Sequence, residues 1–210
     1  MSYTLLSISE AGVALWSYHT RRLALEADSA ARERWLALGR EGAPGVWAVW
    51  TDDAQGLRTE PRPGSRLHHG MPSRTRPSPI AGLAGPIPKP APPGIYDRVR
   101  RAGTATLLLS EDGTEILEAC CAAVVSWDGD QIVCVPRNRP RVWSTAEAAI
   151  RDHLPTREAI IPAGSDALLL VNAVKGTCAL ADPRSRGFPP RVRLEIEELF
   201  ARLSFRPGRE

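Results

Sequence analysis

Ten of the nineteen prolines in this chain lie between Pro61 and Gly94, and no other feature of the sequence constrains the fold as strongly. Proline fixes the backbone angle φ and lacks an amide donor, so neither a helix nor a central strand is expected in this segment. We interpret residues 61–94 as an extended, partly polyproline-like connection. It would join a small N-terminal part, residues 1–60, to a larger strand-rich part, residues 95–210.

The proline-rich segment also carries basic side chains, namely Arg62, Arg66, His68, His69, Arg74 and Arg76. Two interpretations of them are open. The segment is either a solvated linker or an active-site loop whose arginines contact an anion.

Composition limits the class of protein. A hydrophobic content of 43% and a charged content of 24% are ordinary for a soluble globular protein. The net charge of +3 is too small to indicate a protein that binds nucleic acid, because such proteins concentrate a larger basic excess on one face. No apolar run approaches the roughly 18 residues of a membrane span, and residues 1–14 lack the pattern of a signal peptide. We therefore expect a cytoplasmic protein that binds neither nucleic acid nor membranes.

The four cysteines, Cys120, Cys121, Cys134 and Cys178, contain no C-x-x-C pair, and no histidine lies at a metal-ligand spacing from them. Adjacent residues of a strand point to opposite faces, so Cys120 and Cys121 are not expected to bind one metal ion. Buried, reduced thiols are the expected state in the cytoplasm.

Periodicity, capping residues and turn residues predict a mixture of helices and strands. Before the prolines these are a helix over residues 13–25, whose start also fits a short strand, a helix over 29–38 capped by Asp28, and a hairpin of strands 45–51 and 57–60. After the prolines they are a helix over 95–102, strands over 105–109, 115–127 and 131–135, a helix from Ser144 or Thr145 to His153, strands over 167–171 and 177–180, and an amphipathic helix over 190–203. This pattern predicts an α+β fold.

Residues 107–123 read Leu-Leu-Leu-Ser-Glu-Asp-Gly-Thr-Glu-Ile-Leu-Glu-Ala-Cys-Cys-Ala-Ala, and Asp128-Gly129-Asp130 and an apolar run to Pro136 follow. This succession of a strand, a glycine turn, a strand carrying Glu118, an Asp-Gly turn and a further strand resembles the centre of class IV aminotransferases. Among them it is most similar to 4-amino-4-deoxychorismate lyases. The resemblance covers about residues 19–180 and implies a shortened class IV aminotransferase fold, with pyridoxal phosphate (PLP) as the cofactor.

The resemblance assigns the catalytic lysine. The family carries the lysine that forms a Schiff base with PLP seven residues before a tyrosine in many members, and Lys89 and Tyr96 have this spacing. The only other lysine of the chain, Lys175, lies in a predicted turn. The resemblance therefore implies Lys89 as the Schiff-base residue. Since lysine is almost always exposed, a surface position in the linker is the alternative.

Glu118 corresponds to the glutamate that lies below the pyridine nitrogen in this family, where a carboxylate keeps that nitrogen protonated. Its strand is otherwise apolar, and a lone buried carboxylate is strongly destabilising. A buried Glu118 therefore requires a partner. A solvent-facing position on an edge strand is the alternative.

Two further segments resemble the family's phosphate site. His19-Thr20-Arg21-Arg22-Leu23 is similar to a His-x-x-Arg-Leu motif whose arginine grips the phosphate with parallel hydrogen bonds, although Arg22 also fits an exposed helical position. Ser144 and Thr145 stand where the family has a phosphate turn at the start of a helix.

Asn172 and Ala173 belong to a stretch that resembles the family's asparagine-centred turn near the phosphate and the substrate. Three departures accompany these matches: Ala123 replaces a family asparagine, the glycine of the phosphate turn is missing from residues 143–146, and only 18 residues precede His19.

The implied activity is that of an aminodeoxychorismate lyase, which forms 4-aminobenzoate and releases pyruvate. Transamination of a small amino acid is the second interpretation, and a non-enzymatic relative that has lost the cofactor is the third. The resemblance also implies a homodimer with a small-molecule amino substrate.

Overall fold

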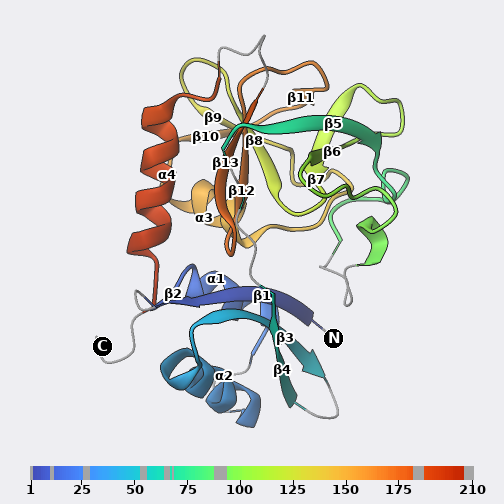
Figure 1. The fold of residues 1–210 in the computed structure, drawn as a ribbon. Helices are drawn as coiled ribbons and strands as arrows, with labels where there is room; N and C mark the ends of the chain where they lie inside the picture. Colours follow the sequence, from blue (N-terminus) through green and yellow to red (C-terminus); the bar gives the residue numbers. More distant parts are fainter. Residues whose placement is uncertain are drawn as a thin grey trace.

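The computed structural model of the chain describes residues 2–9, 12–25, 29–52, 56–63, 67, 69–87, 94–181 and 187–205. Its strands form two sheets, one of four strands and one of nine, and the predicted α+β class is confirmed. Figure 1 shows the smaller sheet below the larger one, with α2 (Ala30–Glu41) on its far side and α4 (Pro190–Arg202) along the flank of the larger sheet.

The smaller sheet is antiparallel throughout and has the order β2-β1-β3-β4. Its strands are β1 (Ser2–Ser9), β2 (Gly12–Val13), β3 (Gly45–Asp52) and β4 (Gly56–Arg62). The predicted hairpin of β3 and β4 is confirmed. β1 is not among the predicted elements, although every second residue from Thr4 to Ile8 is buried.

Two helices pack on this sheet, α1 (Trp16–Leu23) and α2. They confirm the helices predicted over residues 13–25 and 29–38, except that Val13 belongs to β2. The N-cap of α2 is Ser29, whose hydroxyl accepts a hydrogen bond from the Arg32 amide at 3.1 Å. Asp28, the predicted cap, lies outside the described residues.

Gly39 of α2 packs against the ring of Trp16, which in turn stacks on Trp35 with 3.9 Å between the ring centroids. A Cβ atom at residue 39 would lie 2.7 Å from Cη2 of Trp16. We expect Gly39→Ala to lower the free energy of unfolding by ~1–3 kcal/mol, because overpacking outweighs the better helix propensity of alanine. Gly82→Ala is the control, since a Cβ there meets no atom within 4 Å. Urea unfolding of both variants tests this, and a stabilised Gly39→Ala protein would contradict it.

The larger sheet has the order β10-β9-β8-β12-β13-β5-β6-β7-β11. In chain order its strands are β5 (Met71–Pro77), β6 (Ala105–Leu109), β7 (Glu115–Ala119), β8 (Ala123–Trp127), β9 (Ile132–Cys134), β10 (Thr156–Glu158), β11 (Ile161–Pro162), β12 (Leu168–Asn172) and β13 (Gly176–Ala181). The strands predicted over residues 105–109, 131–135, 167–171 and 177–180 are confirmed to within one residue at each end.

β5 corrects the prediction for the proline-rich segment. It has a parallel neighbour on each side, β13 and β6, in the middle of the larger sheet. Its two prolines, Pro72 and Pro77, stand near its ends, so the residues between them keep their amide donors for pairing. Residues 61–94 are therefore more than a connection, because their start belongs to β4 and their centre belongs to the larger sheet.

Two other predictions need correction. The strand predicted over residues 115–127 is two strands, because the chain turns between β7 and β8. Ala119 and Ala122 exchange backbone hydrogen bonds of 2.9 and 3.3 Å across this turn. No glycine or proline marks the turn in the sequence. The helix predicted over residues 95–102 is only a 3₁₀ turn over Gly94–Tyr96.

The helices α3 (Thr145–His153) and α4 confirm the two predicted near the end of the chain. They pack on one face of the larger sheet, where Ile150 and Leu199 share a buried cluster with Leu169 of β12. After α4 the chain reaches the smaller sheet, where Phe205 and Val13 exchange two backbone hydrogen bonds of 2.9 Å. The segment after α4 thereby pairs with β2 at the edge of the smaller sheet.

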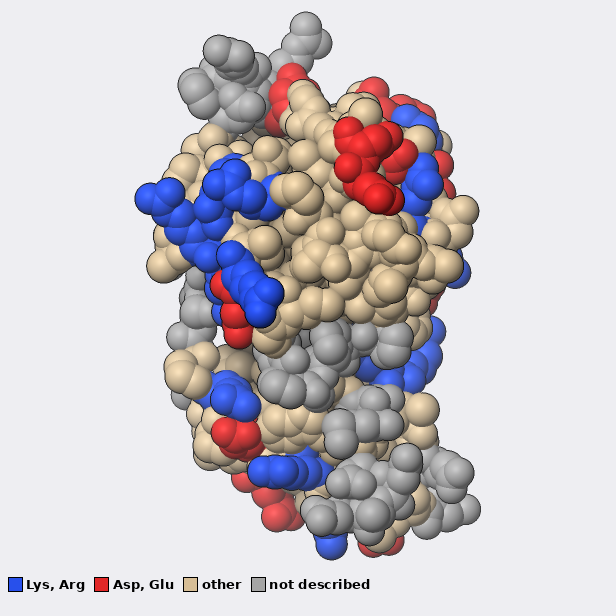
Figure 2. Space-filling model, turned by 90° about the vertical axis from the view of Figure 1, so that its right-hand side faces the viewer, with Lys and Arg blue, Asp and Glu red and all other residues tan. Residues whose placement is uncertain are grey.

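Charged side chains of both signs lie on the surface. On the face that Figure 2 shows, Lys and Arg form several separate groups, with Asp and Glu close to some of them. Among the described helices, none has the length and apolar character that crossing a bilayer requires.

Candidate functional site

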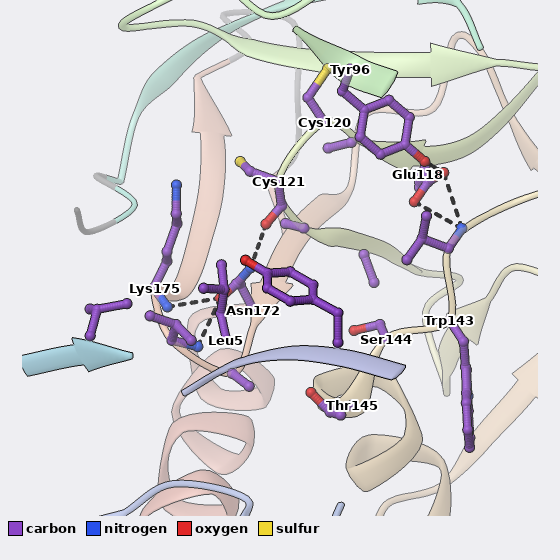
Figure 3. Close-up of a pocket in the computed structure, with 18 of the residues that line it drawn as sticks. Leu5, Tyr96, Glu118, Cys120, Cys121, Trp143, Ser144, Thr145, Asn172 and Lys175 are labelled. Carbon is purple, nitrogen blue, oxygen red and sulfur yellow. Dashed lines mark hydrogen bonds between the residues drawn. The ribbon is translucent and has the colours of Figure 1, made fainter. Parts of the chain in front are cut away.

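A cavity of about 400 Å³ lies between the two sheets. The smaller sheet contributes Tyr3 and Leu5 of β1 and Val46 of β3 to its lining. The larger sheet contributes the β7–β8 turn and the β12–β13 turn, and the start of α3 completes the wall. Figure 3 shows how the labelled side chains surround this space.

Six of the predicted site residues line this one cavity: Arg22, Glu118, Ser144, Thr145, Asn172 and Ala173. They come from α1, β7, the start of α3 and the turn after β12, so the fold brings together segments that are far apart in the sequence. Lys89 lies outside the described residues, and its assignment remains a prediction from the sequence. Ala123, which replaces a family asparagine, also lines the cavity.

Glu118 is a buried carboxyl group with two hydrogen-bond donors. Glu118 is only 4% exposed to solvent, so the alternative of a solvent-facing position on an edge strand is wrong. The Tyr96 hydroxyl donates to it at 2.5 Å, and the Val142 amide donates at 3.2 Å to each carboxyl oxygen. Burial raises the pKa of Glu118 to about 7, against the opposing effect of these two hydrogen bonds and of the Arg141 charge. The group therefore changes protonation close to neutral pH.

A β-bulge in β7, next to Glu118, helps to position this carboxyl group. The pairing of β6 with β7 passes from Leu108↔Glu118 to Leu109↔Ile116, which leaves Leu117 without an opposite residue. Tyr96 ends the 3₁₀ turn and is itself buried. Burial and the neighbouring Glu118 raise the pKa of Tyr96 far above its ordinary value, so its hydroxyl remains a donor at any physiological pH.

Arg22 connects α1 to the loop before α3, because its Nη2 donates to the carbonyl of Trp143. It is partly buried, so the alternative of an exposed helical arginine is wrong. Burial lowers the pKa of Arg22 to about 10, and the guanidinium is still charged at neutral pH.

The start of α3 forms the wall next to this arginine. Ser144 is the N-cap, and its hydroxyl accepts from the Glu147 amide at 3.3 Å. Thr145 is the first helical residue and is buried. The first amides of a helix lack partners within the helix, and the positive end of its dipole favours an anion. With the Arg22 charge beside it, this end of the cavity suits a phosphate group.

Asn172 holds two turns of the cavity wall together. Its Oδ1 accepts from the amides of Val174 and Lys175 at 2.8 and 2.9 Å, and its Nδ2 donates to the carbonyl of Cys121. These bonds fix the β12–β13 turn against the β7–β8 turn. Asn172 thereby shapes the part of the wall to which Ala173 belongs.

A buried ion-pair cluster fixes the loop that carries Val142. Arg141 makes a bidentate contact with Glu147, and Arg151 pairs with the same carboxylate at 2.6 Å. The side chains of Arg141, Glu147 and Arg151 are 3%, 2% and 7% exposed. Because Arg141 directly precedes Val142, this cluster holds the amide that binds Glu118.

The sequence analysis missed several lining residues, among them Tyr3, Leu5, Arg100 and Lys175. Residues 3–8 read Tyr-Thr-Leu-Leu-Ser-Ile, and this content of β-forming residues is the sequence signal that identifies the first two as strand residues. Lys175 was assigned to a turn, which is confirmed, but its place in the cavity wall depends on how that turn docks.

A scan against protein-family models gives no match for this sequence, and a search of curated proteins gives none either. Similarity is found among solved structures. A fold IV transaminase from Curtobacterium pusillum matches with a TM-score of 0.64 and 19% identity, over 96% of this chain and 84% of that chain. A 4-amino-4-deoxychorismate lyase from Pseudomonas aeruginosa matches with a TM-score of 0.56 and 18% identity, over 94% of this chain and 88% of that chain.

The PLP-bound form of a hypothetical aminotransferase from Mycobacterium tuberculosis is a third similar structure. Its TM-score is 0.59 and its identity 16%, over 97% of this chain and 88% of that chain. At such low sequence identity, the structural similarity establishes the fold and nothing more. The chain therefore has a class IV aminotransferase-like fold in a divergent form, as its sequence motifs predict.

Proposed function

We propose that this protein is a PLP-dependent enzyme of the aminodeoxychorismate lyase type. The observation that carries the proposal is the buried carboxyl of Glu118, which shares one cavity with Arg22 and the start of α3. Structural similarity to PLP-dependent fold IV enzymes supports it.

The side chains of the cavity fit PLP. A carboxylate has about four acceptor sites, so Glu118 retains capacity for a further donor beside Tyr96 and Val142, and would bind the pyridine nitrogen. Arg22 and the first turn of α3 would bind the phosphate. When bound, PLP supplies an electron sink for the carbon next to the substrate's amine.

The protein's own residues would orient this chemistry. The Tyr96 hydroxyl and the Val142 amide hold the Glu118 carboxyl in place, and from this position it would hold a proton on the pyridine nitrogen. Asn172 fixes the part of the wall that would face the substrate. The amine of Lys89 would bind the cofactor and carry a proton to and from the substrate carbon.

The lyase reaction, which forms 4-aminobenzoate and pyruvate, is the favoured activity. The stretch Glu118-Ala-Cys-Cys-Ala-Ala resembles the lyase branch, and a lyase from Pseudomonas aeruginosa is among the similar structures. Transamination of a small amino acid is the second candidate, because transaminases are among those structures as well. A homodimer, as the resemblance implies, is part of the proposal.

Cofactor mapping tests the proposal. The purified protein with PLP is expected to gain visible absorbance, and borohydride reduction followed by peptide mass spectrometry should place the cofactor on Lys89. Lys89→Ala should lose both signals and Lys175→Ala should keep both, since only these two side chains can carry the cofactor. Attachment to Lys175 would refute the assigned lysine. No absorbance at saturating PLP would leave the non-enzymatic alternative, whereas 4-aminobenzoate formation by the loaded protein would establish the lyase.

A further inference from the structure

Two adjacent cysteines line the cavity. Cys120 and Cys121 are the central residues of the β7–β8 turn, between the two alanines that exchange backbone hydrogen bonds. Adjacent side chains of a regular strand point to opposite faces of the sheet, but the turn gives both cysteines a place in one wall. Cys120 packs with Tyr96, and the carbonyl of Cys121 accepts a hydrogen bond from Asn172 (Figure 3). A small oxidant that enters the cavity therefore reaches this pair.

The surroundings of the four cysteines favour oxidation at Cys121. The thiolate is the form that reacts with oxidants, and burial disfavours it. Burial raises the pKa of Cys134 to about 12 and, with a smaller effect of the neighbouring Cys121, that of Cys120 to about 11. Burial also raises the pKa of Cys178. Cys121 is the one partly exposed cysteine of the four, all of which the structure describes. It is therefore the thiol that an oxidant meets first.

The covalent chain itself holds the second thiol next to the first. The Cα atoms of adjacent residues lie about 3.8 Å apart across a trans peptide, whereas those of most disulfides lie roughly 4.4–6.8 Å apart. A bridge between Cys120 and Cys121 would therefore close a small, strained ring. Strained disulfides are more easily reduced than relaxed ones, and they are typical of regulation rather than of structural support. The dithiol is thus the resting state, and the bridge is reversible.

The β7–β8 turn is also one of the two turns that Asn172 connects. Nδ2 of Asn172 donates to the carbonyl of Cys121, while its Oδ1 accepts from the amides of Val174 and Lys175 at 2.8 and 2.9 Å. Closing the ring requires the backbone at Cys121 to rotate, because both sulfur atoms must come within bonding distance. The carbonyl of Cys121 would then turn away from Asn172, and the two turns would lose their connection.

From this arrangement we infer that Cys120 and Cys121 form a redox-active dithiol, which hydrogen peroxide converts to a reversible disulfide that releases Asn172 from the β7–β8 turn. The Cys121 sulfur first attacks the peroxide and breaks its O–O bond, which gives a sulfenic acid and one water. The Cys120 sulfur then attacks the Cys121 sulfur, the S–O bond breaks, and hydroxide leaves with the Cys120 proton as a second water. The dithiol loses two electrons and two protons, and the peroxide is reduced to water.

Peptide mass spectrometry locates the bridge. Cleavage after Glu118 and before Asp128 releases a peptide, residues 119–127, whose only cysteines are Cys120 and Cys121. After the reduced protein is treated with hydrogen peroxide, this peptide should lose the mass of two hydrogen atoms and regain it with dithiothreitol. Alkylation of the remaining thiols should show that this pair is oxidised at least ~10-fold faster than Cys134 and Cys178, because burial suppresses their thiolates.

Variants separate the roles of the two thiols. Cys120→Ala should stop at the sulfenic acid of Cys121, which dimedone traps, because no adjacent thiol is left to close the ring. Cys121→Ala should take up no dimedone and form no bridge. Cys178→Ala is the matched control, since Cys178 is fully buried and does not line the cavity, and it should form the bridge as the wild type does.

Hydrogen exchange measures the effect on the cavity wall. The amides of Val174 and Lys175 should exchange ~10-fold faster or more in the oxidised wild type than in the reduced wild type, because the turn that protects them is no longer anchored. Peroxide-treated Cys121→Ala should keep the slow exchange of the reduced protein.

Four results would overturn the inference: a bridge from Cys121 to Cys178, a bridge between two chains, a sulfenic acid that persists in the wild type as in Cys120→Ala, or equal exchange in the oxidised and reduced wild type. None of these measurements requires PLP or turnover. A protein that does not bind PLP could still form the bridge, and a PLP enzyme could fail to form it, so the two proposals fail separately.

Discussion

The Glu118→Gln protein is expected to be more stable than the wild type at pH 8 and to lose most of its turnover. The stability gain follows from the pKa of Glu118, which burial raises from 4.5 to about 7. Glutamine preserves the acceptor oxygen for Tyr96 and Val142 but cannot ionise. It therefore avoids the cost of a buried charge while it keeps the shape of the site.

The direction with pH follows from the raised pKa. An unfolded chain releases the Glu118 proton near pH 4.5, whereas the folded protein holds it until about pH 7. Stability from this group is therefore fully present below pH 4.5 and is lost as the pH rises through 7. The shift corresponds to roughly 3 kcal/mol at most, so the variant and the wild type should differ little at pH 4.5 and by ~1–3 kcal/mol at pH 8.

Urea unfolding between pH 4.5 and pH 8 measures this difference. Glu111→Gln is the control, because Glu111 is exposed in the turn between β6 and β7. Turnover of the PLP-loaded variant should fall by ~100-fold or more, because the pyridine nitrogen loses its charged partner. A pH-independent difference in stability would show that Glu118 titrates at its ordinary pKa. Normal turnover would remove Glu118 from the site.

Glu147→Gln is expected to be among the most destabilising single changes in this chain. Among the residues that the structure describes, Glu147 is the carboxylate that contacts both Arg141 and Arg151, and its side chain is 2% exposed. Without its charge, Arg141 remains buried and unpaired, which costs ~3–5 kcal/mol in comparable cases. Glu147→Gln should also weaken the binding of PLP, because Arg141 fixes the loop that carries Val142.

Glu195→Gln is the matched control for this change. Glu195 pairs with Arg191 four residues earlier on α4, at 3.1 Å, but the arginine is 90% exposed and the glutamate 44% exposed. Its loss should lower the free energy of unfolding by less than ~0.5 kcal/mol. If Glu147→Gln were as mild as this control, the buried cluster would contribute little to stability.

The sequence predicts most elements of this fold but not how they meet. Periodicity identifies α1, α2 and α4, because the apolar residues of a buried helix face recur at helical spacing within one segment of sequence. β5 was not predicted, because the prolines of its segment indicated that no central strand could form there. A proline near each end of the strand nevertheless leaves its centre free to pair on both sides. The turn between β7 and β8 could not be predicted for another reason: it consists of alanine and cysteine, and neither residue is typical of turns.

The candidate site is predictable to a similar degree. Motif resemblance places Arg22, Glu118 and Asn172 in one site, and the structure brings them to one cavity. The hydrogen bond from Tyr96 to Glu118 is not readable from the sequence, because it depends on how the 3₁₀ turn packs on β7. The exposure of Lys175 to the cavity likewise depends on the docking of two turns.

The pairing of Phe205 with Val13 has a consequence for biosynthesis. Phe205 also stacks on Trp16, with 5.1 Å between the ring centroids, and it follows every strand of the larger sheet in the sequence. Domains generally fold from the N-terminus during synthesis, but the smaller sheet cannot gain this contact until all strands of the larger sheet have been translated. A nascent polypeptide would therefore leave the Phe205 side of the Trp16 ring uncovered while the larger sheet is being made.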